Sequence, residues 1–171
     1  CYILNYNLID VLPPNLDGVL SGILGEGTAA AYIEGSWSGS LVDAGLDGFK
    51  GYWFRTDEEI DFSFDFSNPG FARNVNTESK VLLEGFEFVQ SSSQAAYFIK
   101  SIPQAKIDDW IIAFNDDIVI GARKWDGKII DVPVMGADGE SYSFGYINEG
   151  HVPTFMLYNI DTGNLEEGTK D

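Results

Sequence analysis

Oxygen-bearing side chains are the residues of this sequence whose type and spacing could hold a metal ion. They lie in turn-like segments rich in Asp, Asn and Gly: Asn115, Asp116, Asp117, Asp126, Asp138 and Asp161. Such side chains in a glycine-containing loop can surround a hard cation, which makes calcium the candidate ion. None of the spacings is that of an EF-hand, and ordinary turn formation accounts for the same residues. Both interpretations stay open, and no cofactor is required.

Few combinations of residues in this sequence could form a catalytic site. It has one histidine, His151, and one cysteine, Cys1, so a Ser-His-Asp triad has a single possible base and a Cys- or His-rich zinc site is excluded. No phosphate-binding glycine motif occurs. The paired carboxylates of a glycosidase are harder to exclude, but the acids lie mostly in turns and on polar strand faces. We therefore predict that the protein is not an enzyme.

Two tryptophans are candidates for binding a sugar ring. Trp37 and Trp125 have polar or charged neighbours and are predicted to be exposed, whereas Trp110 lies in the apolar run DWIIAF and is predicted to be in the core. Tryptophan carries the largest apolar area of any side chain and more often fills a core than a binding platform. A carbohydrate-binding module is therefore the alternative function.

The charge of the chain excludes two classes of partner. There are 27 Asp and Glu residues and 10 Lys and Arg residues, for a net charge of −17. Nucleic acid and anionic lipid both attract positive surfaces, so neither is an expected partner. No apolar run approaches the ~18 residues of a membrane helix. Cys1 fits either the lipid-anchor site of a bacterial lipoprotein or an ordinary first residue of the sequence.

The pattern of apolar residues predicts a mainly β protein made of two small sandwich-like modules. The first module spans about residues 1–70 and carries one short helix at about residues 16–24, where apolar residues recur at spacings of three and four. The second spans residues 80–171. Residues 71–79, rich in Asn and Ser, are the predicted linker.

Short runs with strand-like alternation recur about every ten residues, with Asp and Gly turns between them, as in a β-sandwich. The predicted strands cover residues 2–12 (as one or two short strands), 28–33, 51–55, 60–66, 81–89, 94–100, 109–114, 117–125, 128–135, 141–147 and 153–159. An Asn-Asp-Asp turn joins two of them, with Trp110, Ile112 and Phe114 on one face of the first.

Three segments in the second half together resemble a known kind of module: FEFVQSSSQAAYFIK, DDWIIAFNDDIVIGARKWDG and VPVMGADGESYSFGYINEGHVPTFMLYN. Their order and spacing are similar to a module of large secreted proteins of marine bacteria that often end in a type IX secretion sorting domain. The first half resembles a companion module more loosely. The resemblance implies a β-sandwich building block of a secreted or surface protein and assigns no catalytic residue.

We therefore expect a non-enzymatic, extracellular structural or adhesive protein of a bacterial cell surface, able to form part of a filament or surface assembly. Its expected partners are other copies of itself, or surface proteins and glycans. Exposed strands can pair between subunits, which provides a physical route to assembly.

Overall fold

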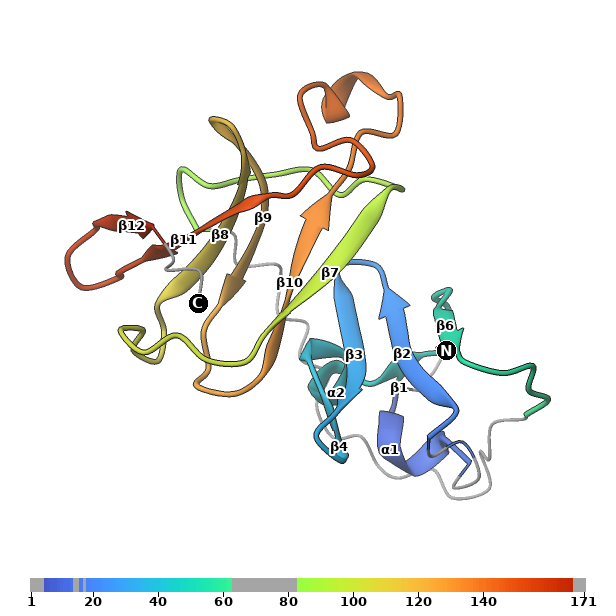
Figure 1. Ribbon diagram of the computed structural model, residues 1–171. Coiled ribbons are helices and arrows are strands. Elements are labelled where there is room, and N and C mark those ends of the chain that lie inside the picture. The colour runs from blue at the N-terminus through green and yellow to red at the C-terminus, as the bar shows by residue number, and fades with distance from the viewer. Residues whose placement is uncertain (1–4, 14–15, 17, 63–82, 168–171) are drawn as a thin grey trace. The chain divides into compact units, whose positions relative to one another are not determined.

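The computed structural model describes residues 5–13, 16, 18–62 and 83–167 and is mainly β, as predicted (Figure 1). The chain divides into two compact units, Cys1–Ser79 and Lys80–Asp171. The predicted linker at residues 71–79 lies outside the described residues. Within the described residues, no helix has the length and apolar character needed to cross a bilayer.

Unit 1 is built from a four-stranded antiparallel sheet in the order β4-β3-β2-β6 and a small β1–β5 pair. Its elements are β1 (Asn5–Tyr6), α1 (Leu8–Val11), β2 (Leu20–Gly25), β3 (Thr28–Ile33), β4 (Ser36–Ser38), α2 (Ser40–Ala44), β5 (Leu46–Asp47) and β6 (Trp53–Thr56). Aliphatic residues from the two helices and from β2 and β3 form one core, which includes Leu8, Val11, Ile23 and Leu41. The two short helices thus cover the sheet. The strand prediction for residues 2–12 is confirmed only at β1 and is wrong at α1, where the Asn7 side chain caps a helix by accepting from the Ile9 N–H at 3.0 Å.

The helix predicted at residues 16–24 is wrong, because most of this segment is strand β2. A β-bulge explains the misleading spacing: Leu20 pairs with Thr56 and Gly22 pairs with Arg55, so Ser21 is an extra residue. An extra residue shifts the following side chains to the opposite face. Leu20 and Ile23, three apart, consequently both enter the core. A spacing of three therefore came from a bulged strand and not from a helix.

Unit 2 holds a four-stranded antiparallel sheet in the order β12-β11-β8-β9 and a β10–β7 pair. The strands are β7 (Gln94–Ile99), β8 (Trp110–Asn115), β9 (Ile118–Lys124), β10 (Ile130–Met135), β11 (Thr154–Tyr158) and β12 (Leu165–Glu167), with one 3-10 turn, η2 (Ser141–Ser143). β8 and β9 form the predicted hairpin around Asp116 and Asp117.

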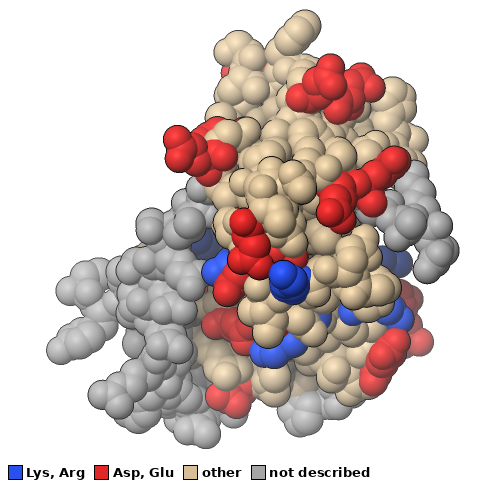
Figure 2. All heavy atoms as spheres, turned by 90° about the vertical axis from the view of Figure 1, so that its left-hand side faces the viewer, with Lys and Arg blue, Asp and Glu red and all other residues tan. Residues whose placement is uncertain are grey.

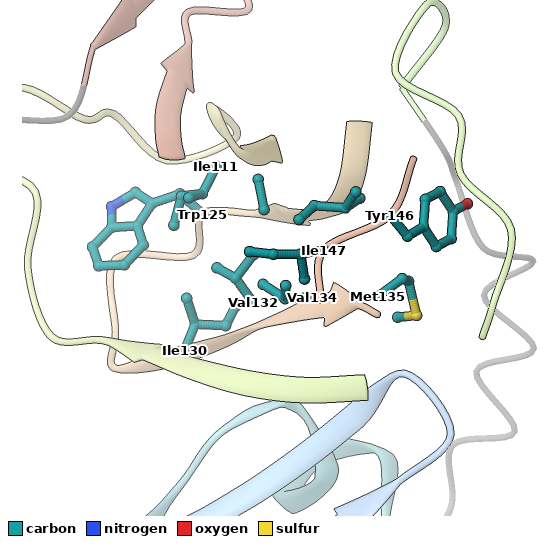
Figure 3. Close-up of a cluster of buried hydrophobic side chains, with 10 residues drawn as sticks. Ile111, Trp125, Ile130, Val132, Val134, Met135, Tyr146 and Ile147 are labelled. Carbon is teal, nitrogen blue, oxygen red and sulfur yellow. The ribbon is translucent and has the colours of Figure 1, made fainter. Parts of the chain in front are cut away.

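The central sheet of unit 2 is buried on both faces. One face packs against β10 through a core of Ile111, Ile120, Val132 and Val134 (Figure 3). The opposite face carries Trp110, Ile112 and Phe114, as predicted, and is covered by partly buried side chains of Leu83, Phe86 and Phe88. The near-continuous apolar run of β8 follows from this double burial.

Two predicted strands of unit 2 are not strands. Residues 83–89 run without ladder pairing, and residues 141–147 form η2 and a loop. In the first segment, the alternating Phe86 and Phe88 cover a sheet face without joining it. Residues 60–62 of the predicted 60–66 strand are also irregular, and the remaining residues of that strand lie outside the described ones.

β9 and β10 meet at a close backbone approach. A Cβ atom on Gly121 would overlap the carbonyl oxygen of Pro133, so this position accepts glycine alone without a backbone shift. Next to it, the Arg123 Nη2 atom lies 2.9 Å from Oδ2 of Asp131, whose side chain is 1% exposed. The Arg123 Nε–H also donates to the Asp131 backbone carbonyl at 2.8 Å. These contacts join the two sheets of unit 2.

Candidate binding surfaces

The residues predicted to bind calcium lie in separate turns of unit 2. Asn115, Asp116 and Asp117 form the β8–β9 turn, whereas Asp126 follows the opposite end of β9. Asp138 lies in the β10–β11 loop and Asp161 in the β11–β12 turn. In the part of the chain that the structure describes, no three His, Cys, Asp or Glu side chains come together as metal ligands.

Several of these oxygen groups are engaged in hydrogen bonds or ion pairs within the protein. The Asp126 carboxylate accepts from the Lys128 backbone N–H at 2.9 Å, and Asp161 pairs with Lys106 at 3.0 Å. The Asn115 amide donates to the Gly145 carbonyl at 2.9 Å. Calcium binding stays a prediction, and a melting temperature that is higher in calcium than in chelator would support it.

Asp138 organises the β10–β11 loop. Its Oδ2 atom accepts from the Ser92 backbone N–H and hydroxyl, both at 3.0 Å, and from the Tyr142 hydroxyl at 2.7 Å. Hydrogen bonds from Tyr142 and Ser143 hold the pKa of Asp138 well below its usual range, while the bond to Asp138 raises the pKa of Tyr142 to about 12. A general acid needs the opposite shift, so Asp138 is suited to bracing the loop.

Further bonds tie the same loop to the sheet. The Gly136 N–H donates to the Ser93 carbonyl at 2.7 Å, and the Ala137 N–H donates to the Ile147 carbonyl at 2.9 Å. The Tyr146 hydroxyl accepts from the Val89 N–H at 2.8 Å and donates to the Val89 carbonyl at 3.1 Å. The loop is therefore held along most of its length.

This braced loop presents apolar side chains to solvent. Phe144 is 89% exposed and Val152 72%, and the neighbouring Ile118 and Tyr142 are also exposed. A Cβ atom built on Gly145 would meet the Ile118 side chain, so the β8–β9 turn touches this loop. Val152 lies two residues before Thr154, which pairs with Phe114 at the same end of the sheet. We call Ile118, Tyr142, Phe144 and Val152 the apolar tip.

Two tryptophans, Trp37 and Trp125, differ from prediction. Trp125 is 5% exposed and belongs to the core of unit 2, so the prediction that it is exposed is wrong (Figure 3). Its charged neighbours in sequence project outward because strand side chains alternate. Trp37 is half-buried against the unit 1 core, with its ring 5.7 Å from that of Tyr32. Trp110 is in the core, as predicted, and the exposed tryptophan is Trp53 on β6.

The acids of the segment DDWIIAFNDDIVIGARKWDG have structural roles. Asp109 is fully buried, and its carboxylate accepts from the backbone N–H groups of Lys106 at 2.8 Å and Ile160 at 3.1 Å. It thereby joins the segment before β8 to the turn after β11. Asp108 pairs with Lys124 at 2.7 Å on the surface. Asp108 and Asp109 therefore hold neighbouring segments together at one end of the β8–β9 hairpin.

Comparison with protein-family models, curated proteins and solved structures finds no match.

Proposed function

We propose that this chain is a non-enzymatic structural or adhesive module of an extracellular bacterial surface protein, and that it contacts its partner through the apolar tip of unit 2. The observation that carries the proposal is the near-complete exposure of Phe144 on a loop held by hydrogen bonds. The extracellular setting comes from the resemblance of residues 84–160 to modules of secreted proteins.

Exposure of Phe144 is unfavourable for the isolated molecule. Burying such a side chain is worth about 1.5–3 kcal/mol, which a flexible loop could gain by folding the ring back onto the sheet. The bonds of Asp138 and Asn115 oppose that rearrangement. A loop that is already ordered loses less entropy on binding, and aromatic anchors supply much of the affinity at interfaces. The arrangement therefore suits docking into an apolar pocket.

The charge around the tip limits the kind of partner. Asp116, Asp117, Glu140 and Glu149 are exposed in the same turn and loop, which contain no Lys or Arg. Acidic groups are also spread over the face shown in Figure 2. Such a rim repels phosphate groups and favours a protein surface that carries Lys or Arg. The tip therefore fits an apolar pocket with a basic rim.

Replacement of Phe144 tests the proposal. We expect Phe144→Ser to reduce binding of fluorescently labelled protein to cells of the source organism at least about tenfold. Stability should change by about 0.5 kcal/mol or less, because the side chain is exposed. Binding is measured by flow cytometry, and unfolding by urea titration.

Phe49→Ser is the matched control, because Phe49 is 76% exposed on unit 1. It should leave cell binding unchanged. Equal binding by wild type and Phe144→Ser, or equal losses in the two variants, would show that the tip is not the contact. Absence of binding by the wild type would remove the adhesive function altogether.

A carbohydrate-binding module is the second candidate, now centred on a different residue. Trp53 is 64% exposed and lies two residues from the exposed Arg55 on β6, so a ring face and a hydrogen-bond donor occur on one strand. Aromatic rings supply large apolar area at such sites. A glycan array with hits that vanish in Trp53→Ala would favour this function. Hits that persist in Trp53→Ala would exclude this strand as the site.

A further inference from the structure

Strand β7 differs from the other edge strands of the described sheets. It runs for six residues, Gln94–Ile99, with no charge, no proline and no bulge, and among the described strands it pairs with β10 alone. Among the other edge strands, β12 has three residues and two of them are Glu, β4 has three residues, and β6 has four including an Arg. β9 carries Arg123 and Lys124, β10 carries Asp131 and Pro133, and β1 and β5 have two residues each. Short or charged edges resist strand addition, whereas β7 lacks these protections.

The pairing register shows which backbone groups of β7 face outward. Gly136 N–H donates to the Ser93 carbonyl, so residues 93, 95, 97 and 99 direct their backbone groups toward β10. Ala96 and Phe98 therefore direct theirs away from β10. The position of Pro133 is consistent with this alternation. Pro133 has no N–H and lies opposite Ala96, where the β7–β10 ladder requires no N–H from β10.

Charge favours this edge for contact between copies. Each chain carries a net charge of −17, so two copies repel each other on average. The face in Figure 2 shows acidic groups at several places, with Lys and Arg between those of its lower part. Residues 88–107 are the exception, because these 20 residues contain two Lys and no acid. β7 lies inside this acid-free stretch. Repulsion between copies is therefore weakest along this uncharged edge strand.

We propose that β7 is a self-association edge, which pairs antiparallel with β7 of a second copy about a two-fold axis at Tyr97. In this register Ala96 of one copy faces Phe98 of the other, and their outward N–H and C=O groups form four hydrogen bonds. The contact is isologous, with the same strand on both sides. It deepens the proposed structural role by naming a partner, and it uses a surface separate from the apolar tip.

The test is sedimentation velocity of the full chain from about 5 μM to about 500 μM, a range that covers weak association. We expect a concentration-dependent dimer. Ala96→Pro removes an outward N–H and leaves the β10 ladder intact, so it should weaken dimerisation at least about tenfold. Ala95→Lys places a charge at an exposed position of the same strand. It should also weaken dimerisation, because a charged edge strand resists pairing with another strand.

Leu165→Pro is the matched control, since by the same parity its N–H faces outward from β12. It should leave dimerisation unchanged. A wild type that is monomeric throughout overturns the proposal, as does a dimer that persists in both β7 variants or is lost in Leu165→Pro. Cell binding by Phe144→Ser is measured separately, so failure of the β7 contact is distinguishable from failure of the adhesive function.

Discussion

The buried ion pair between Arg123 and Asp131 allows a quantitative prediction about unit 2. It joins β9 to β10, with 2.9 Å between Nη2 and Oδ2 and a second bond from Nε–H to the Asp131 carbonyl. The two partners differ in their access to water: the Arg123 side chain is 22% exposed and that of Asp131 is 1% exposed. Removing Arg123 and removing Asp131 should therefore lower the unfolding free energy by different amounts.

Arg123→Met removes the cation and leaves a carboxylate that has little access to water. Breaking a buried pair in this way destabilises proteins by about 3–5 kcal/mol, and we expect about 4 kcal/mol here. Asp131→Asn keeps the shape of the side chain and leaves the guanidinium, which reaches solvent, so we expect about 2 kcal/mol. The double variant Arg123→Met with Asp131→Leu should be more stable than Arg123→Met, because it leaves no buried charge.

Urea unfolding measures these differences. In a background with Trp37→Phe and Trp53→Phe, fluorescence reports the buried Trp110 and Trp125 of unit 2. If the unfolding free energy falls with urea concentration at the same slope in all variants, only stability has changed. The prediction is wrong if Arg123→Met lowers the unfolding free energy by less than about 1 kcal/mol, or if Asp131→Asn lowers it more than Arg123→Met does. Either result would mean that the burial of Asp131 does not set the free energy of the pair.

The Asp138–Tyr142 bond predicts two titrations. The lowered pKa of Asp138 means that its contribution to stability is present above the unfolded pKa of about 3.9 and is lost as pH falls through the folded value; Tyr142→Phe should raise this pKa in an NMR titration. The raised pKa of Tyr142, about 12, means that its contribution is present below about pH 10 and is lost as pH rises through the folded value; in Asp138→Asn, ultraviolet absorbance should show this tyrosine titrating nearer 10. At the β9–β10 crossing, Gly121→Ala should destabilise unit 2 by about 3 kcal/mol, because the added methyl group overlaps the Pro133 carbonyl. Gly51→Ala in unit 1, with open space around it, should be near neutral when urea unfolding of the whole chain is followed by circular dichroism, which reports both units. Equal effects of the two alanines in that measurement would contradict the overlap.

Much of the fold follows from local periodicity. Alternation predicted β3, β7, β8, β9, β10 and β11, because each strand places successive side chains on opposite faces of a sheet. The β8–β9 hairpin was predictable because the Asp116–Asp117 turn lies between two apolar runs. The place of Trp110 followed as well, since it shares the buried parity of Ile112 and Phe114.

Where prediction failed, a distant part of the chain decided the outcome. The bulge at Ser21 gave a strand the spacing of a helix, and it is visible only in the pairing of β2 with β6. Phe86 and Phe88 alternate like strand residues but cover a sheet face without a ladder partner. Trp125 is buried in a core formed with residues of β8, β9 and β10, which its charged sequence neighbours did not indicate.

Composition and side-chain period, which are local properties of the chain, were enough to predict an acidic, mainly β protein with few residue combinations suited to catalysis. The roles of its polar and aromatic residues were set by the tertiary structure. It paired Arg123 on β9 with Asp131 on β10, bonded Asp138 to Ser92 within the loop that exposes Phe144, and left the outward backbone groups of Ala96 and Phe98 unpaired by any described strand. These outcomes depend on how separate strands and loops pack together, and no local pattern encodes them.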